Sequence, residues 1–305
     1  MKKLAAVVLS IILVVSMVGC SSSGKTTTVS PGQKETNTVP TKTSEPVKTS
    51  EPVKKNEDPT IEELVMYDQD GITITAKSLD LKSFMGPAVK LLIENNTDRS
   101  IIVQTRNTSV NGYMVDTVLS ADVAAGKKSN DELTILESDL QNAGITTIAD
   151  IETSFHIFDA DSWNEIVDTD LYSLKTSAYE GFEYTFDDSG EVVYNAGGIK
   201  IVVKGLAKDS SFLGPQIMLF IVNESGRDIT VQARDVSVNG FMVESILSSD
   251  VADTKCRVSG LSFLSSDLEK NEIEKIENCE VSFHIFDSDS WATITDTDPI
   301  TISFE

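Results

Sequence analysis

The sequence has few of the residues from which disulfide frameworks and metal centres are built. Its 305 residues include three cysteines and two histidines. Three cysteines exclude a disulfide-dense small domain and the cysteine-rich zinc scaffolds. Two histidines leave few ways to assemble a transition-metal centre. The composition therefore predicts neither a metal site nor a cofactor site.

Basic residues are also scarce. Lys and Arg number 25 against 48 Asp and Glu, which gives a net charge of −23 and a pI near 4.4. Binding to nucleic-acid phosphates depends on clustered Lys and Arg, so the composition argues against a nucleic-acid partner. Hydrophobic residues make up 40% of the chain, enough for packed cores. The length then suggests about two domains.

The apolar stretch near the N-terminus is too short to cross a membrane. Lys2 and Lys3 precede twelve apolar or small residues at 4–15, whereas a membrane-spanning helix needs about twenty. The pattern predicts a secretory signal peptide over residues 1–19. Residues 17–20, Met-Val-Gly-Cys, resemble the lipobox of bacterial lipoproteins, although Leu is usual at the position of Met17. The resemblance implies that Cys20 is acylated and holds the chain on the extracellular face of the cell membrane. The alternative is an ordinary signal peptide with an incidental cysteine.

Residues 20–60 have the composition of a tether. They are rich in Thr, Ser, Pro and Lys, and they contain two copies of KTSEPVK, at 42–48 and 48–54. Such a segment buries too little apolar surface to offset the entropy of ordering, so we expect it to be disordered. Its charges nearly cancel, and residues 61–305 carry a net charge of −26. The acidity therefore belongs to the part of the chain that folds.

The remainder of the sequence is one unit written twice. SFHIFDADSWNEIVDTD (154–170) and SFHIFDSDSWATITDTD (282–298) are identical at 13 of 17 positions, with an offset of 128. The same offset relates SVNGYMV at 109–115 to SVNGFMV at 237–243. The duplication predicts two domains. We refer to residues 61–177 as repeat 1, to 178–189 as the connector and to 190–305 as repeat 2.

Each repeat has the patterning of β-structure. Ile199, Ile201 and Val203 alternate with polar residues, as in a half-buried strand, and residues 216–223 are apolar on both faces. The Asn-Gly pairs at 111–112 and 239–240 fit two-residue hairpin turns. A short helix or turn is expected at 137–144 and again at 265–273. About seven short strands per repeat predict an all-β fold of two tandem immunoglobulin-like β-sandwiches.

A resemblance to a known family follows from these segments. The order of segments in each repeat resembles the telokin-like immunoglobulin domains of Gram-positive lipoproteins. These segments are the central apolar strand, SIIVQTR (100–106) or DITVQAR (228–234), S-V-N-G-x-M-V and F-H-I-F-D. The resemblance covers both repeats. It implies the fold and a location in the cell envelope, but no catalytic residue.

The two histidines are the first candidates for chemistry. His156 and His284 occupy equivalent positions, and alternation with Phe155 and Ile157 turns His156 outward. A residue present in both copies serves each domain separately, so a surface or cross-strand role is favoured over a metal ligand or general base. No Ser-His-Asp order, nucleophile elbow, phosphate loop or zinc motif is present in the sequence. We therefore expect no enzymatic activity.

The remaining candidates are cysteines and acidic corners. Cys256 and Cys279 occur in repeat 2 alone, and the sequence leaves open whether they form a disulfide. Each repeat also places two Asp-x-Asp pairs after the F-H-I-F strand. These aspartates could bind Ca²⁺, but capping of tight turns is the favoured interpretation. They are Asp159, Asp161, Asp168 and Asp170 in repeat 1, and Asp287, Asp289, Asp296 and Asp298 in repeat 2.

Two functions remain open at the level of sequence. The favoured one is a lipid-anchored, non-enzymatic cell-surface protein whose modules bind a protein or cell-wall partner. The alternative is a solute-binding lipoprotein that works with a transporter. Transporter receptors of this length are usually built as two α/β lobes, and alternating β-α-β units are missing here. A pocket between the modules, lined by residues that differ between the copies, would favour the alternative.

Overall fold

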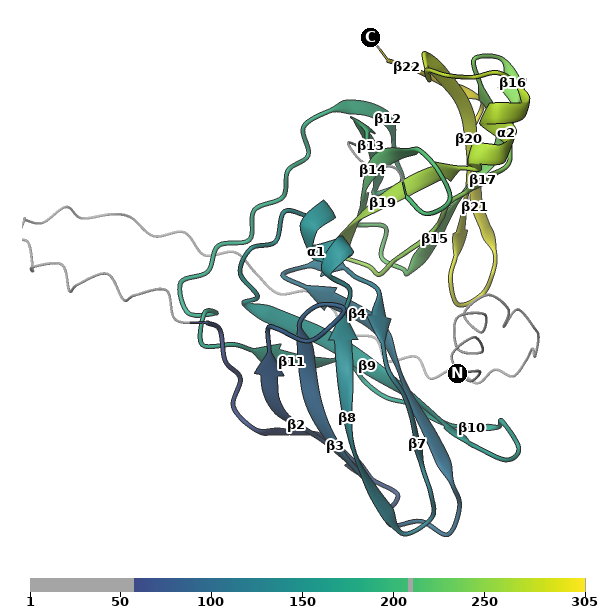
Figure 1. Ribbon diagram of the computed structural model, residues 1–305. Coiled ribbons are helices and arrows are strands. Elements are labelled where there is room, and N and C mark those ends of the chain that lie inside the picture. The colour runs from purple at the N-terminus through teal and green to yellow at the C-terminus, as the bar shows by residue number, and fades with distance from the viewer. Residues whose placement is uncertain (1–57, 208–210, 305) are drawn as a thin grey trace, which may run out of the picture. The chain divides into compact units, whose positions relative to one another are not determined.

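The computed structural model describes residues 58–207 and 211–304, which include most of both repeats (Figure 1). The signal peptide and most of the tether lie outside the described residues. The strands and the helix of repeat 1 are β1 (Leu64–Gln69), β2 (Ile72–Asp80), β3 (Ala88–Asn95), β4 (Ile101–Val110), β5 (Tyr113–Met114), β6 (Thr117–Val118), β7 (Ser120–Val123), β8 (Lys127–Ile135), α1 (Glu137–Asn142), β9 (Asp150–Asp159), β10 (Glu165–Asp168) and β11 (Tyr172–Lys175).

Repeat 2 contains the same elements in the same order. They are β12 (Glu191–Ala196), β13 (Ile199–Leu206), β14 (Gln216–Asn223), β15 (Ile229–Val238), β16 (Phe241–Met242), β17 (Ser245–Ile246), β18 (Ser248–Val251), β19 (Lys255–Phe263), α2 (Ser265–Lys270), β20 (Asn278–Asp287), β21 (Thr293–Asp296) and β22 (Ile300–Ser303). No helix in this described part of the chain is long and apolar enough to span a membrane.

Two sheets make up each repeat. In repeat 1, one sheet has the order β1-β2-β3-β8-β6. In the other, β9 pairs with β4 on one side and with β10 and β11 on the other, while β4 also pairs with β5 and β7. Repeat 2 repeats these pairings, and Figure 1 shows β13, β14 and β19 side by side. The all-β, immunoglobulin-like sandwich expected from the sequence is confirmed.

The strand count exceeds the seven or so expected. The described residues form eleven strand segments in each repeat, because β5 and β6 are only two residues long and β10 and β11 pair with different stretches of β9. The expected helices are confirmed as six-residue α1 and α2. The expected Asn-Gly turns are confirmed as well. Asn111 and Gly112 have φ of 51° and 82°, and the equivalent pair in repeat 2 has 50° and 83°, the positive values that a type I′ turn requires.

Apolar residues of alternating strand positions form a separate core in each repeat. In β9, Ile151, Phe155 and Ile157 are fully buried, while His156 between them is partly exposed, as the alternation predicts. The core of repeat 2 is built from equivalent residues, including Phe283 and Ile285, and receives one side chain from repeat 1, Met114. Each repeat therefore has its own hydrophobic core.

A buried asparagine closes the turn after the central strand in both repeats. Asn95 is fully buried, and its amide donates to the carbonyls of Arg99 and Val123, both at 2.8 Å. Its Oδ1 accepts from the backbone N–H and the hydroxyl of Thr97. Asn223 makes the same set of bonds in repeat 2. Every polar group of this side chain is thus satisfied, which a buried amide requires.

The outer face of β14 is covered by repeat 1. Phe220 and Cys256 of repeat 2 are buried in an apolar cluster with Tyr113 of β5. Tyr113 and Cys256 are also paired in parallel between β5 and β19, so that one sheet continues from repeat 1 into repeat 2. This contact explains why residues 216–223 are apolar on both faces, whereas the equivalent strand β3 carries Lys90 and Glu94.

Ion pairs flank this cluster. Lys255 is paired with Glu152, and Nη2 of Arg257 lies 2.5 Å from Oδ1 of Asp116. Arg257 is the one arginine that has no counterpart in the other repeat, where Ser129 takes its place. Arg257 thus distinguishes repeat 2 at this contact, whereas Lys255 and Glu152 have identical counterparts in the other repeat, Lys127 and Glu280.

Residues 190–305 are expected to fold without repeat 1. All strands of repeat 2 and almost all of its core lie in this fragment, and about 115 residues suffice for one core. Circular dichroism should give a β-type spectrum with a cooperative melt. Excision uncovers Phe220 and Cys256, so the matched control carries Val222→Glu and Cys256→Lys, the residues that repeat 1 has at these positions. If this control also stays unfolded, the two repeats form a single interleaved core.

Candidate functional site

The three cysteines were candidates for a lipid anchor and a disulfide. Cys20 lies outside the described residues. Cys256 and Cys279 are both free, so the disulfide that the sequence left open is not formed. They lie in different sheets and different apolar clusters: Cys256 packs with Phe220 at the junction, and Cys279 packs in the core of repeat 2. Burial raises the pKa of each thiol to about 12, which keeps both protonated at neutral pH and poorly reactive.

Each histidine is held by an aspartate across a hairpin. Nδ1 of His156 lies 2.5 Å from Oδ1 of Asp168, and Nη1 of Arg106 lies 2.9 Å from the other oxygen of that carboxylate. In repeat 2, His284 and Asp296 have the same 2.5 Å separation, while Arg234 lies 3.9 Å from the carboxylate. The cross-strand role favoured by the sequence is therefore observed. Among the described hydroxyl and thiol groups, none is hydrogen-bonded to either ring as a nucleophile would be.

The first aspartate of each acidic corner caps a tight turn. Oδ1 of Asp159 accepts hydrogen bonds from the backbone N–H groups of Asp161 and Ser162 and from the Ser162 hydroxyl. The hydrogen bonds from Ser162 lower the pKa of the Asp159 carboxyl. Asp287 makes the same bonds in repeat 2, with the same effect on its pKa. The turn-capping interpretation of Asp159 and Asp287 is confirmed.

A tryptophan follows each capped turn and lies over the hairpin. Trp163 has φ of 60° and stacks on Phe158 with ring centroids 5.6 Å apart. Trp291 stacks on Phe286 in the same way, at 5.5 Å. Both indoles nevertheless remain about 70% exposed. They cover a core residue on one face and offer the other face to solvent.

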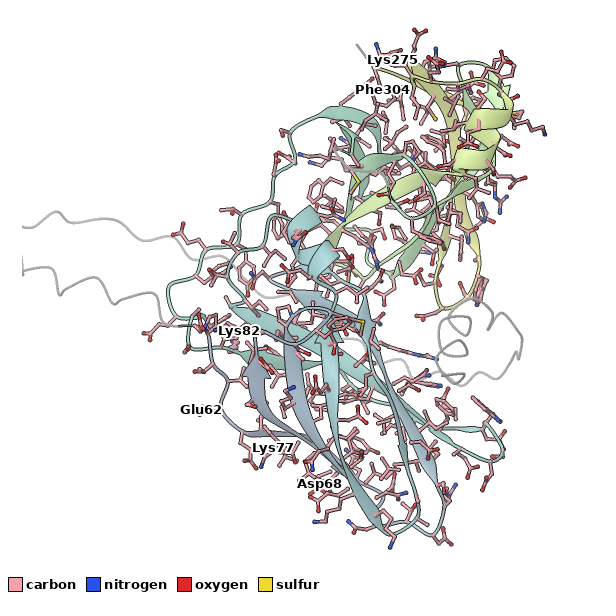
Figure 2. All side chains as sticks on the ribbon, viewed as in Figure 1. Glu62, Asp68, Lys77, Lys82, Lys275 and Phe304 are labelled. Atoms are coloured by element: carbon pink, nitrogen blue, oxygen red, sulfur yellow. The ribbon has the colours of Figure 1, made fainter. Side chains whose placement is uncertain are left out.

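Among the residues that the structure describes, the most exposed apolar side chains are two phenylalanines that sequence reasoning did not select. Phe84 and Phe212 are fully exposed, at 100% and 103% of the reference accessibility, and they occupy equivalent loops. The loop of Phe84 joins β2 to β3 and begins near Lys82, which Figure 2 labels. The sequence does show that both copies retain this phenylalanine, since the segments Ser-Phe-Met-Gly-Pro and Ser-Phe-Leu-Gly-Pro match at an offset of 128. Their exposure could not be read from the sequence, because loops have no alternation.

Backbone hydrogen bonds hold these loops in place. The N–H of Glu137 donates to the carbonyl of Met85 at 3.0 Å, and the N–H of Ile135 donates to that of Pro87 at 2.8 Å. In the described part of the loop of Phe212, from residue 211 on, the N–H groups of Ser265 and Phe263 donate to the carbonyls of Leu213 and Pro215, both at 3.0 Å. The phenylalanine rings are therefore presented to solvent from a supported backbone in both repeats.

A cavity of about 610 Å³ opens beside the apolar cluster that joins the repeats. Tyr113 and the end of α1 line it on one side, and Lys204 and Met218 line it on the other. Several of the lining residues differ in kind from their counterparts in the other repeat. Among them are Gln141, Asn142, Met218 and Val258, against Glu269, Lys270, Lys90 and Asn130.

Comparison with known proteins leaves the family open. No protein-family model matches the chain, and no curated protein matches its sequence. Solved structures with a loose likeness include the YadV chaperone (11% identity, TM-score 0.24, covering 77% of this chain and 100% of that one). Another is the SafA pilin of Salmonella enterica in complex with the SafB chaperone (11%, TM-score 0.19, 71% and 89%). A third is the exo-chitosanase CsxA of Amycolatopsis orientalis (12%, TM-score 0.23, 79% and 26%). Likenesses at these TM-scores carry no argument about function.

Proposed function

We propose that this chain is a lipid-anchored, non-enzymatic cell-surface protein whose two immunoglobulin-like repeats bind a protein or cell-wall partner. The observation that carries the proposal is the pair Phe84 and Phe212. Both are fully exposed, and both stand on loops fixed by backbone hydrogen bonds. A phenylalanine retained in both copies for folding alone would be buried.

The physical reason is the free energy that these rings gain on contact. Burying one phenylalanine side chain is worth about 1.5–3 kcal/mol, and aromatic anchors commonly dominate interfaces. A fixed loop loses little entropy when the ring is buried in a partner. Two equivalent anchors on one chain also allow two contacts at once, which raises the overall affinity without any new contact surface.

The proposed location rests on the N-terminal sequence. The segment ending at Cys20 has the features of a lipoprotein signal, and the following tether has the composition of a flexible spacer. A spacer of this length would carry the repeats away from the membrane, across a thick cell wall, and leave both phenylalanines accessible.

Photo-cross-linking from the phenylalanines tests the binding role. A benzophenone amino acid at position 84 or 212 of the full chain, displayed on living cells, is expected to give the same adduct from both positions. The matched controls carry it at Asp98 or Asn164, which are exposed and polar, and should give no such adduct. The double variant Phe84→Ser/Phe212→Ser should keep its melting temperature and lose the partner. Equal adducts from test and control positions would contradict the proposal.

The alternative of a solute-binding lipoprotein is favoured by one observation, the cavity lined by residues that differ between the repeats. The cross-linking experiment separates the two functions. If positions 84 and 212 give no adduct while native mass spectrometry finds a small molecule on the chain, and Met218→Trp removes that molecule, the solute-binding function is supported instead.

A further inference from the structure

The hairpin of β9 and β10 brings three potential metal ligands together in repeat 1. They are His156 from β9 and Glu165 and Asp168 from β10. One donor atom from each residue lies within 4.8 Å of the other two. The histidine is partly exposed and both carboxylates are exposed, so an ion could reach all three from solvent.

A β-bulge makes this arrangement possible. Glu165 pairs with Phe158 and Asp168 pairs with His156, while the register shifts between Glu165 and Val167. Without the extra residue, positions 165 and 168 would point to opposite faces of the strand. With it, both carboxylates lie on the face of His156, because residues directly opposite one another share a face.

The donor set and the distances suit a divalent transition-metal cation. Imidazole nitrogen and carboxylate oxygen bind Zn²⁺ at about 2.0–2.2 Å, so that two ligands in a tetrahedral site lie roughly 3.3–3.6 Å apart. The donor atoms here are 2.5 Å apart for His156 and Asp168 and at most 4.8 Å apart for any pair. Small side-chain rotations on an exposed hairpin would bring them to the required spacing. Three protein ligands would leave a fourth position for water or for a group of a partner.

Charge distinguishes the two repeats at this place. In repeat 1, two carboxylates face one guanidinium, that of Arg106, which leaves a local charge of −1. In repeat 2, Thr293 pairs with Phe286 and so occupies the position of Glu165. Asp296 there is offset by Arg234, and no local charge remains to attract a cation. Repeat 2 is therefore a natural copy of the site with one ligand removed.

We propose that His156, Glu165 and Asp168 form a binding site for a divalent transition-metal cation in repeat 1, and that repeat 2 lacks the site because Thr293 replaces Glu165. Arg106 keeps its bond to the second oxygen of Asp168 and orients this carboxylate, as outer-shell partners do in metal sites. This site does not depend on the proposed function, because it needs neither Phe84 nor the anchor.

Titration calorimetry of the full chain with Zn²⁺ tests the proposal. A millimolar excess of Mg²⁺ is kept present to occupy the many other carboxylates. The wild-type chain is expected to bind one Zn²⁺. Glu165→Thr should weaken binding by more than the roughly 10–100-fold that loss of an outer-shell partner causes, and Thr293→Glu should create a second site. Both substitutions are at exposed positions, and each introduces the residue that the other repeat has at the equivalent position. The melting temperature should therefore not change.

Tryptophan fluorescence gives an independent readout. The chain has two tryptophans, and Trp163 is linked to the site through Phe158, whose ring contacts both His156 and Trp163. In a Trp291→Phe chain, Co²⁺ should quench Trp163 saturably, and Glu165→Thr should abolish this quenching. The matched control is the Trp163→Phe chain, in which Trp291 should respond only after Thr293→Glu. Binding unchanged by Glu165→Thr, no second site in Thr293→Glu, or no saturable binding to the wild type would each overturn the proposal.

Discussion

Replacing Gly86 with alanine is expected to destabilise repeat 1 by about 3–5 kcal/mol. Gly86 has φ of 140°, a conformation that residues with a side chain rarely adopt. A Cβ atom there would lie 2.2 Å from the carbonyl oxygen of Ile135 and 2.7 Å from the backbone nitrogen of Glu137. Both neighbours are backbone atoms of residues whose N–H groups hold the loop of Phe84, by donating to Pro87 and Met85, so neither residue can shift without straining these bonds.

Single-tryptophan chains allow the effect to be assigned to one repeat. Urea unfolding followed by Trp163 in a Trp291→Phe background should show the loss for Gly86→Ala. The matched control is Gly126→Ala, where φ is 66° and no atom lies within 4 Å of the added carbon. Gly126→Ala should lower the free energy of unfolding by only the roughly 1–2 kcal/mol that a left-handed backbone conformation costs a residue with a side chain. Equal losses in the two variants would show that the contact with Ile135 does not determine the need for glycine.

Replacing Cys20 with alanine is expected to release the protein from the membrane completely. If Cys20 carries two acyl chains, each buried methylene contributes about 0.8 kcal/mol to anchoring, and two chains together hold a protein stably. Without the thiol there is no acceptor for lipid. Cell fractionation and detergent phase partitioning should find the wild type with membranes and the Cys20→Ala chain in the aqueous phase.

The matched control for the anchor is the neighbouring residue. Ser21→Ala leaves the acceptor thiol in place and should remain with the membrane. Met17→Leu, which restores the residue usual at that position of a lipobox, should be anchored at least as well as the wild type. A Cys20→Ala chain that still sediments with membranes would show that the lipoprotein interpretation is wrong.

The fold was largely predictable because its signals are local and occur twice. Alternation in β9 and β13 marked the strands, and the Asn-Gly pairs marked the hairpins. Duplication supplied two independent examples of every segment, so a pattern present in both copies carried more weight than either alone. Whether Cys256 and Cys279 are bonded was not predictable from the sequence. The position of Cys256 on the outer face of a sheet depends on which strands are neighbours.

The candidate metal site depends on a feature that patterning cannot reveal. Glu165 and Asp168 are three apart, and strict alternation places them on opposite faces. The bulge between Glu165 and Val167 brings both carboxylates to the same face. The residue types at 165–168 do not predict a bulge. In the same way, the full exposure of Phe84 follows from hydrogen bonds between its loop and residues about fifty positions later in the chain. Such long-range backbone contacts are set by the tertiary fold and not by local composition.

The junction between the repeats has a consequence for how far this architecture can be extended. Repeat 2 offers an apolar outer face at Phe220 and Cys256, and repeat 1 covers it with Tyr113. The same face of repeat 1 carries Glu94 and Lys128, which form an ion pair with each other. Lys128 is also exposed to solvent. A further copy of the module would meet this ion pair where Val222 and Cys256 lie in repeat 2, with the smaller Leu92 in place of Phe220. A module placed before repeat 1 would therefore meet a charged surface on this face, in place of the apolar contact that joins the two repeats.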